Sequence, residues 1–445
     1  MSVDFTYRIH MPHRAGQLAK LTGAIADAGG LIGDITTESV TREGSVRELT
    51  VEVEGDDHAK KLADTLGELD EVEVDWFRDR ALWVHEGGKL NIEPVHRVAN
   101  VQDMRDVYTP GVARACRAIE DDPDAAAKYT MIGRTVAICT NGTRVLGLGN
   151  VGPRAAMPVM EGKAVFYRQL AGISAMPLLV DADDPDEFIE TVKRIAPTFG
   201  GIHLEDIRAP DCFEIEKRLG DELDQPVMHD DVHGTAVVTL AATMVAARQA
   251  DIDMREATVG QIGLGAAGWG IAALMVEGGA GRVLGSDPKE ETHDKAREAG
   301  IEVTGLEELM AEADVVVATT GQPGFIETNM VRDGQIIFAL TNPEPEIDPR
   351  AAKEAGAALA FDGASVNNVL GYPGIFKGAL RACANCVDTQ MKLAAAWAIA
   401  GLSIESDQLV PDVLDPDVHE HVATAVCRAA IASGAGREGA GPPGL

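Results

Sequence analysis

The sequence predicts an α/β protein of three domains: a small βαββαβ unit, an α/β domain with a parallel sheet, and a doubly wound domain at the carboxyl end. Three observations support this fold class. Residues 4–77 hold four strand-like segments and two segments with helical periodicity. From residue 99 onward, short apolar runs alternate with helical segments, which is typical of parallel sheets. A GxGxxG motif then joins a predicted strand to a predicted helix at residues 263–268.

The first domain is expected over residues 1–80. Its strands are predicted at residues 4–10, 31–39, 48–54 and 72–77, and its helices at residues 14–29 and 57–69. Gly29 and Gly30 are expected to end the first helix. The resulting order βαββαβ is that of a small ferredoxin-like unit.

Residues 13–35, HRAGQLAKLTGAIADAGGLIGDI, resemble the opening of an ACT domain. ACT domains are regulatory modules that often bind amino acids at a loop like the one around Gly16. The family commonly has Pro before this glycine, whereas this chain has Ala15. The resemblance implies a site for an amino-acid or other metabolite effector. A dimerisation module without a ligand is an equally good interpretation.

A linker is predicted at residues 81–98, where a Gly pair and a Pro interrupt the pattern. The second domain is expected over residues 99–225. Its strands are predicted at residues 135–142, 144–149, 174–181 and 201–207, and its helices around residues 114–123, from Pro153 onward and near residues 188–199. This alternation predicts a parallel sheet, whose ligands gather at the carboxyl ends of the strands. Glu205 and Asp206 lie at such an end.

The third domain is expected over residues 226–445, with helices packing back across the chain between residues 378 and 432. Its glycine motif follows a predicted strand. Gly263 permits the tight turn after the strand, Gly265 lets the backbone approach a pyrophosphate, and Gly268 lets helix and strand pack closely. The apolar runs that follow it are RVLGSD, ADVVVATTG, QIIFALTNP and AALAFDG. This pattern predicts a Rossmann-type NAD(P)-binding domain.

The preference between NAD and NADP stays open. Asp287 follows the next strand, 24 residues after Gly263, where an acidic side chain accepts hydrogen bonds from a ribose 2′-hydroxyl. That placement favours NAD. Lys289 follows two residues later and could pair with a 2′-phosphate, so NADP also fits.

Two carboxylate clusters suggest a metal site. Glu205 and Asp206 form one cluster, and Asp230 with Asp231 forms the other. Carboxylate oxygens from separate loops suit a hard divalent cation such as Mg²⁺ or Mn²⁺. In so acidic a chain, solvated surface is the competing interpretation of any one of these residues. The neighbouring histidines at positions 203, 229 and 233 would suit zinc, but the carboxylate majority favours the harder ion.

Composition excludes several classes of protein. The chain has 71 acidic against 39 basic residues, a formal charge of −32, spread along its whole length. Such a surface repels nucleic acid and anionic membranes, and it predicts a halophilic protein whose self-repulsion is screened by salt. No run of about 18 apolar residues offers a membrane span. The start lacks a signal-peptide pattern and the six cysteines are scattered, which predicts a cytoplasmic protein. Cys383 and Cys386 are expected to be packed thiols inside a helical pattern.

Seven ordered motifs between about residues 86 and 390 resemble the malic enzymes. They are DVYTPGVA, TRVLGLGNVGPRAAMPVMEGKAVFY, GGIHLEDI, HDDVHGTA, IGLGAAG, LTNPEPEI and SVNNVLGYPG. The resemblance implies metal-dependent oxidative decarboxylation of (S)-malate to pyruvate and CO₂, with reduction of NAD or NADP. It also implies a homodimer or homotetramer.

The resemblance also implies roles for individual residues. Tyr108 would be the general acid that protonates enolpyruvate, Lys163 the base that takes the hydroxyl proton, and Asp230 the group that tunes this lysine. The metal would be held by Glu205, Asp206 and Asp231. Malate would be contacted by Arg144, Asn342 and one of Asn367 and Asn368, of which Asn368 is favoured. The chain departs from the family pattern at Val232, where Gln is common, and in its added N-terminal domain.

Two alternatives remain. One is a related hydroxy-acid dehydrogenase or decarboxylase of the malolactic type, which would share the motifs. The other is a catalytically silent nucleotide-sensing protein that uses its ACT-like domain for regulation. The presence of Tyr108, Lys163 and all three presumed metal ligands argues against the silent protein.

Overall fold

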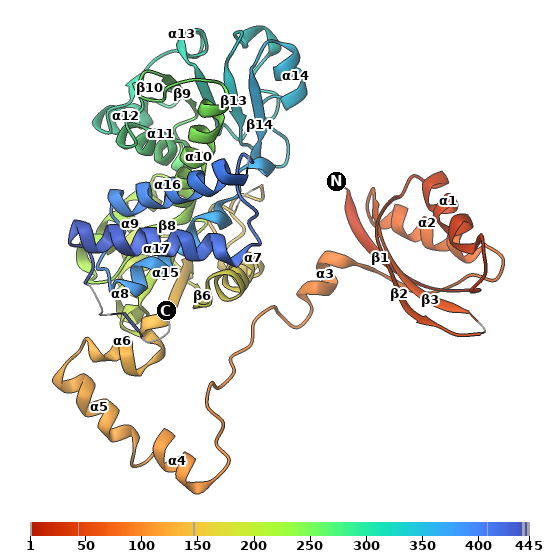
Figure 1. Ribbon diagram of the computed structural model, residues 1–445, viewed down its shortest axis with the longest axis horizontal. Helices are drawn as coiled ribbons and strands as arrows, with labels where there is room; N and C mark the ends of the chain where they lie inside the picture. The colour runs from red at the N-terminus through yellow and green to blue at the C-terminus, as the bar shows by residue number, and fades with distance from the viewer. Residues whose placement is uncertain (1, 43, 146, 407, 438–440, 443–445) are drawn as a thin grey trace. The chain divides into compact units, whose positions relative to one another are not determined.

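The computed structural model describes residues 2–42, 44–145, 147–406, 408–437 and 441–442. The chain separates into two compact units, one ending at Asn91 and the other beginning at Ile92 (Figure 1). Each unit is described by itself. The finer division of the larger unit at residues 225 and 226 stays a prediction.

The smaller unit has the predicted order βαββαβ. Its elements are β1 Val3–Met11, α1 Gln17–Asp27, β2 Leu31–Val40, β3 Ser45–Val53, α2 Asp56–Gly67 and β4 Glu73–Asp79. The strands form one sheet in the order β2-β3-β1-β4, and each neighbouring pair is antiparallel. Tyr7 and Ile9 of β1 pack with Leu21 and Ile25 of α1 in its core. The Tyr7 hydroxyl donates a hydrogen bond to the Ala59 carbonyl at 3.0 Å, which ties the central strand to α2.

The predicted linker begins as a helix. α3 Arg80–His85 follows β4 directly and occupies the first residues of this segment, and the bounds of the linker stay a prediction. Asp79 caps this helix, because its side chain accepts a hydrogen bond from the Leu82 backbone N–H at 2.8 Å. The stretch from residue 86 to residue 100 then has no helix or strand.

The larger unit contains two parallel sheets. The first has the order β6-β5-β7-β8. Its strands and the helices around them are α4 Val101–Val107, α5 Val112–Asp121, α6 Ala125–Tyr129, β5 Thr135–Thr140, α7 Pro153–Phe166, β6 Ser174–Leu179, α8 Pro185–Ile195, β7 Gly201–Leu204, α9 Asp211–Glu222 and β8 Val227–His229. The parallel arrangement confirms the prediction for this region.

The strand predicted at residues 144–149 is absent from the part of the chain that the structure describes, which omits Leu146. This segment is a tight turn, closed by a hydrogen bond from the Val145 N–H to the Gly149 carbonyl at 2.9 Å. Gly147 and Gly149 both have a φ of 76°, in the left-handed region. These two glycines therefore bend the backbone of a run, residues 144–149, whose apolar residues suggested a strand.

The second parallel sheet has the order β11-β10-β9-β12-β13-β14. Its elements are β9 Thr258–Ile262, α11 Ala266–Glu277, β10 Arg282–Ser286, α12 His293–Glu298, β11 Glu302–Val303, α13 Leu306–Glu312, β12 Val315–Ala318, β13 Ile336–Ala339, α14 Pro349–Glu354 and β14 Leu359–Asp362. In chain order this is the arrangement 3-2-1-4-5-6 of a doubly wound dinucleotide domain. The predicted Rossmann-type sheet is confirmed.

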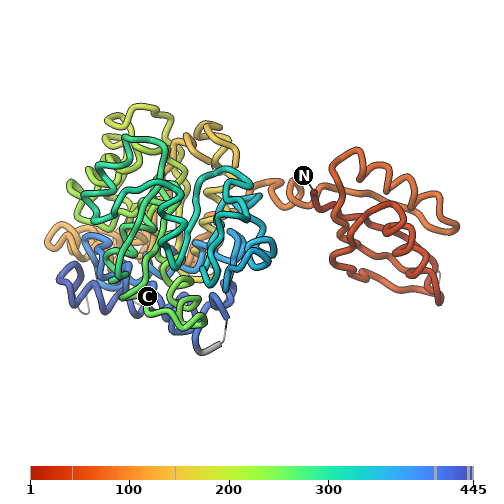
Figure 2. Tube along the Cα trace, turned by 90° about the horizontal axis from the view of Figure 1, so that it is seen from above, coloured from red at the N-terminus to blue at the C-terminus, as the bar shows by residue number. Residues whose placement is uncertain are grey.

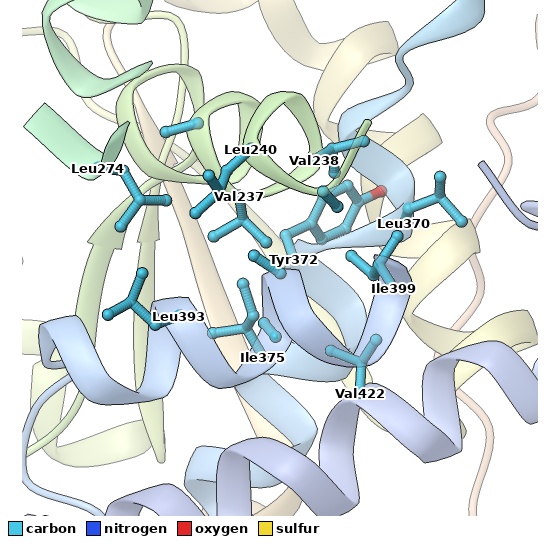
Figure 3. Packing of buried hydrophobic residues seen from close by; sticks show 14 of the residues in the cluster. Val237, Val238, Leu240, Leu274, Leu370, Tyr372, Ile375, Leu393, Ile399 and Val422 are labelled. Carbon is cyan, nitrogen blue, oxygen red and sulfur yellow. The ribbon is translucent and has the colours of Figure 1, made fainter. Parts of the chain in front are cut away.

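Long helices join the two sheets into one body. They are α10 Asp230–Gln249, α15 Tyr372–Arg381, α16 Thr389–Ser406 and α17 Pro416–Ser433. One hydrophobic cluster contains Ile138 of β5, Leu240 of α10 and Val317 of β12. Figure 3 shows Val237 and Val238 of α10 directed toward Tyr372 and Ile375 of α15. The Cα trace in Figure 2 shows these segments gathered in the larger unit.

The predicted helical setting of Cys383 and Cys386 is wrong. Both lie in the turn between α15 and α16, and Cys383 has a φ of 44°. The six cysteines are free thiols.

Among the described residues, no helix is both long enough and apolar enough to cross a bilayer.

Candidate active site

Lys163 lies at the centre of a buried charged cluster. It projects from α7, its Nζ is 2.9 Å from Glu205 Oε2, and it donates a short hydrogen bond to Asp230 Oδ2. Glu205 directly follows β7, and Asp230 opens α10 directly after β8. Three elements therefore bring one ammonium and two carboxylates together at the carboxyl edge of the first parallel sheet.

Opposing effects act on the proton affinity of Lys163. Burial by itself would lower its pKa, but the charges of Asp230 and Glu205 outweigh burial and hold the pKa well above its ordinary value. The Nζ atom also lies 4.6 Å from the centre of the Tyr372 ring. Lys163 is thus an ammonium group in this arrangement.

His203 connects Glu205 to Tyr167, a contact that the sequence did not predict. Its Nε2 lies 2.6 Å from Glu205 Oε2, and its Nδ1 lies 2.8 Å from the Tyr167 hydroxyl. Burial lowers the pKa of His203 to about 3, so the ring is neutral at neutral pH. A neutral ring that donates to Glu205 accepts from Tyr167, and this chain of hydrogen bonds orients the Glu205 carboxylate.

A second set of carboxylates adjoins the first. Glu205, Asp206 and Asp231 each offer an oxygen, and these oxygens lie within 4.8 Å of one another. Burial, reinforced by the Glu205 charge, raises the pKa of Asp231 to about 6. A divalent cation would relieve this repulsion, and an all-oxygen donor set suits Mg²⁺ or Mn²⁺. The residues present therefore fit the predicted metal.

The turn that carries Asp206 is held in place by its neighbours. Asp206 has a φ of 54°, in the left-handed region that is uncommon for a residue with a side chain. Its N–H donates to Asp231 Oδ2 at 3.0 Å, and its carbonyl accepts from the Arg144 N–H at 3.0 Å. The backbone of Arg144, the predicted carboxylate clamp, is therefore fixed to the presumed metal loop.

Asn368 and Asn367 have different surroundings. Asn368 Nδ2 donates to Asp230 Oδ2 at 2.8 Å, so this side chain belongs to the Lys163 cluster. The Asn367 side chain instead accepts from the Val369 N–H at 3.0 Å and caps a short helical turn. These contacts favour Asn368 for a contact with substrate, which stays a prediction.

A cavity of about 1260 Å³ lies beside the cluster in the larger unit. Its walls include Arg144, Asp231, Asn342 and Asn368 together with the glycine motif. The predicted substrate and nucleotide residues therefore border one space.

The glycine motif has the geometry that a dinucleotide requires. Gly263 has a φ of 86°, and a Cβ added to Gly268 would lie 1.8 Å from the Gly263 carbonyl oxygen. A Cβ on Gly265 would meet nothing within 4 Å, so the backbone there borders open space in the cavity. Asp287 accepts from the Leu264 N–H at 2.7 Å and from the Lys289 N–H at 2.9 Å. Asp287 therefore braces the glycine turn as well as facing the cavity.

Tyr108 is the predicted residue that the structure does not bring to the cluster. It caps the carboxyl end of α4, is 70% exposed, and does not line the cavity. Within the described part of the chain, no hydrogen bond or ion pair joins it to Lys163 or Asp230. Its role as general acid stays a prediction.

Val232 is fully buried and lies in an apolar cluster with Trp269. In the described structure neither ring nitrogen of the adjacent His229 has a hydrogen-bond partner. His229 Nδ1 lies 3.7 Å from Asp231 Oδ2, beside the presumed metal ligands.

Comparison with known families matches two parts of the chain. Residues 88–220 match "Malic enzyme, N-terminal domain". Residues 237–323 match "D-isomer specific 2-hydroxyacid dehydrogenase, NAD binding domain". The first match covers the carboxylate cluster except for Asp230 and Asp231, and the second covers the glycine motif.

Curated relatives align along most of the chain. "NAD-dependent malic enzyme 1" of Bacillus subtilis (strain 168) is 49% identical, over 96% of this chain and 97% of the relative. The "Bifunctional malic/malolactic enzyme" of the same organism is 40% identical, over 81% and 95%. The "NADP-dependent malic enzyme" of Halomonas elongata is 38% identical, over 79% and 92%.

A solved structure shares the fold. The malic enzyme from Pyrococcus horikoshii Ot3 superposes with a TM-score of 0.74 at 37% sequence identity. The superposition covers 79% of this chain and 88% of the other.

Proposed function

The chain belongs to the malic enzyme family, and we propose from this how its residues divide the work of the reaction. The enzyme catalyses the oxidative decarboxylation of malate with NAD or NADP and a divalent metal. The observation that supports the division best is the position of Lys163. Its buried ammonium group sits between Asp230 and Glu205, and its cluster adjoins the cavity that the glycine motif lines.

The metal would be held by Glu205, Asp206 and Asp231. A bound Mg²⁺ or Mn²⁺ supplies a Lewis acid for the hydroxyl and carbonyl oxygens of the substrate and offsets the Glu205 charge that raises the pKa of Lys163. Lys163 then takes the malate hydroxyl proton, and Asp230 orients it for this transfer. Asn368 is held beside them by its hydrogen bond to Asp230.

The substrate carboxylates would be held by Arg144 and Asn342 at the cavity wall. The dinucleotide would place its pyrophosphate on the turn Gly263–Gly268, with its adenosine ribose near Asp287. Asp287 favours NAD, and Lys289 beside it leaves NADP accessible.

We assign Tyr108 to the site of a second copy of the chain. The segment around it exposes apolar side chains, of which Val101 is 68% exposed and Met104 and Val107 are each 50% exposed. Such a run is costly to leave in water and suits a subunit interface. A homo-oligomer that buries α4 against another subunit's cavity would provide the missing acid.

Complementation between inactive variants tests this assignment. Lys163→Ala and Tyr108→Phe chains are expressed separately and together. If Tyr108 acts across the interface of a dimer, the mixture regains about a quarter of wild-type turnover, because half the dimers are mixed and each has one complete site. A mixture as inactive as its parents contradicts the assignment.

The smaller unit is proposed to bind a carboxylate-bearing metabolite. A cavity of about 300 Å³ between β1, α1 and β3 is lined by His13, Arg14, Gln17 and Arg47. Two guanidinium groups at one opening suit a carboxylate, and the ACT-like sequence around Gly16 supports an amino acid. Titration calorimetry of the full chain with a metabolite panel tests this. Complete absence of binding leaves dimerisation as the role of the unit.

The reaction itself is tested by following NADH and NADPH absorbance with malate and Mn²⁺. Malate-dependent reduction of either dinucleotide, abolished by a chelator, is the expected result. The malolactic alternative has support in the bifunctional relative and would instead convert malate to lactate without accumulating reduced dinucleotide. Absence of any turnover with metal and cofactor present would favour the silent regulatory protein.

A further inference from the structure

Glu346 is a fully buried carboxylate between two loops of the cavity wall. One loop follows β12 and contains Thr319, Thr320 and Gly321, and the other follows β13 and contains Thr341 and Asn342. All five of these loop residues line the cavity, whereas Glu346 lies behind them.

Glu346 joins the two loops through four hydrogen bonds. Its Oε1 accepts from the Thr320 N–H at 2.7 Å, from the Thr320 hydroxyl at 3.0 Å and from the Thr341 hydroxyl at 2.5 Å. Its Oε2 accepts from the Thr341 N–H at 3.1 Å. The loops also meet directly, since the Gly321 N–H donates to the Thr341 hydroxyl at 2.9 Å. One side chain thus sets the separation of the two loops.

The hydrogen bonds of Glu346 fix the positions of the two loops more strictly than apolar packing would. Within the described residues no basic side chain forms an ion pair with Glu346, so N–H and O–H groups are the only partners of its carboxyl oxygens there. Burying a polar group is expensive unless every such donor is well placed. The two loops are therefore held rigidly, because displacing either loop would leave buried hydrogen-bond donors unsatisfied.

The position of the loops indicates which part of the reaction they serve. A dinucleotide on this sheet crosses the carboxyl ends of the strands at β9. Asp287 follows β10 on one side of that crossing, and the Glu346 loops follow β12 and β13 on the other. If the adenosine half lies near Asp287, the nicotinamide half and the malate beside it meet Thr320, Gly321 and Asn342.

We propose that Glu346 is a positioning residue for this reaction. It holds the two loops at the spacing at which Asn342 and the Thr320–Gly321 backbone align malate with the nicotinamide. The proposal rests on the assignment of the cavity to malate and dinucleotide. A misplacement of about 1 Å at a reacting centre lowers rates by up to about 100-fold, so loss of the clamp is expected to act on turnover first.

Glu346→Gln tests the proposal. The amide keeps the size of the side chain but has a single acceptor oxygen and turns an NH₂ group toward the threonine donors. We expect kcat/KM for malate to fall about 10-fold to 100-fold. The affinity for ADP-ribose, which lacks the nicotinamide, is expected to stay within about twofold, because its contacts lie at the glycine turn and Asp287.

A second pair of variants, at Thr341, tests the same hydrogen bonds without changing Glu346. Thr341→Val removes one donor to Glu346 and is expected to reproduce the loss of kcat/KM, while Thr341→Ser keeps the hydroxyl and restores most of it. If Glu346→Gln does not fold, this pair decides the question alone.

Gln335 provides a matched structural control in the same sheet. It precedes β13, at the amino end of the strand, whereas the Glu346 loops lie at the carboxyl ends. It is also fully buried, and its Nε2 donates to the Met310 carbonyl at 2.7 Å and to the Ala313 carbonyl at 2.9 Å. Gln335→Met is expected to lower Tm and leave kcat and KM within about twofold of wild type. The proposal is overturned if Glu346→Gln behaves like this control, or if ADP-ribose affinity falls as much as kcat/KM. Absence of malate turnover in the wild-type protein would instead refute the functional assignment.

Discussion

Lys163 illustrates how single residues in this site carry opposing demands. An ammonium group between two buried carboxylates is stable, whereas a base must lose its proton. Glu205 resolves the conflict, because it belongs both to the Lys163 cluster and to the presumed metal ligands. The proposed metal site therefore predicts that a bound cation lowers the pKa of Lys163 by offsetting the Glu205 charge.

Replacing this lysine should stop the chemistry without removing the metal site. For Lys163→Ala we expect kcat to fall by about 10²-fold to 10⁴-fold, the range for loss of a positioned base. Mn²⁺ binding, measured by calorimetry, should persist because Glu205, Asp206 and Asp231 remain. Near-normal malate oxidation would eliminate Lys163 as the base.

Lys295 is a second titratable lysine at the cavity wall. Its Nζ lies 4.0 Å from the centre of the Trp269 ring and also over the Phe213 ring. Burial lowers the pKa of Lys295 to about 8. The side chain therefore carries its positive charge below pH 8 and loses it as the pH rises through that value.

This titration should appear in cofactor binding. An anionic dinucleotide is attracted by the ammonium form, so we expect its affinity to fall about threefold to fivefold between pH 7 and pH 9, as for loss of one partly exposed charge contact. In Lys295→Met the affinity should be lower at pH 7 and nearly constant over this range. A wild-type profile that is equally flat would refute the role of Lys295.

Residue identities were only partly predictable. The motifs singled out Lys163, Asp230 and Asn368. The fold brings Asp230 into contact with Lys163, 67 positions earlier in the sequence, and with Asn368, 138 positions later. His203 was considered only as a zinc ligand, although strand alternation places it on the same face as Glu205 two residues later. Tyr167 and Tyr372 gave no signal, because an aromatic residue in an apolar helix looks like ordinary core.

At the scale of elements, glycine decided where regular structure stops. The run from residue 144 to 149 has the apolar content of a strand, but two of its glycines adopt left-handed conformations and turn the chain. This turn places Arg144 beside the Asp206 loop. A strand there would carry Arg144 along the sheet instead.

The contact between α10 and α11 also depends on a glycine. A Cβ on Gly270 would lie 2.1 Å from the Val232 carbonyl oxygen. Gly270→Ala must therefore separate the helices, and we expect a loss of about 1–3 kcal/mol of unfolding free energy in urea. Turnover should fall as well, since Val232 follows Asp231 directly.

Gly401 supplies the control for this substitution. It lies in α16, and an added Cβ would meet nothing within 4 Å. Gly401→Ala should leave turnover unchanged and stabilise the protein by about 0.5–1 kcal/mol, the difference in helix propensity. Equal effects of the two substitutions would show that helix separation is not the cause.

At the scale of the whole molecule, net charge is the dominant feature. A formal charge of −32 over 445 residues imposes self-repulsion that favours expansion of the chain. The screening length falls from about 10 Å at 0.1 M salt to about 3 Å at 1 M. The halophilic character inferred from composition therefore stays a prediction with a direct test.

We expect the unfolding free energy to increase with KCl concentration. Urea unfolding midpoints between 0.1 and 3 M KCl, with sucrose at matched osmolality as the control, measure this effect of screening. A protein most stable in dilute buffer would contradict the prediction. Turnover at the same salt concentrations shows whether activity follows stability.

Local patterns were sufficient for the order of elements in the smaller unit, for the parallel sheets of the larger unit and for the dinucleotide motif. They were wrong about a strand at residues 144–149, where two glycines turn the chain. Periodicity and glycine spacing are properties of neighbouring residues, so they can be read along the chain. The Glu346 clamp, the hydrogen bond of Asn368 to Asp230 and the separation of Tyr108 from Lys163 came only with the fold. Their physical cause is contact between residues distant in sequence, whose geometry depends on packing of whole elements.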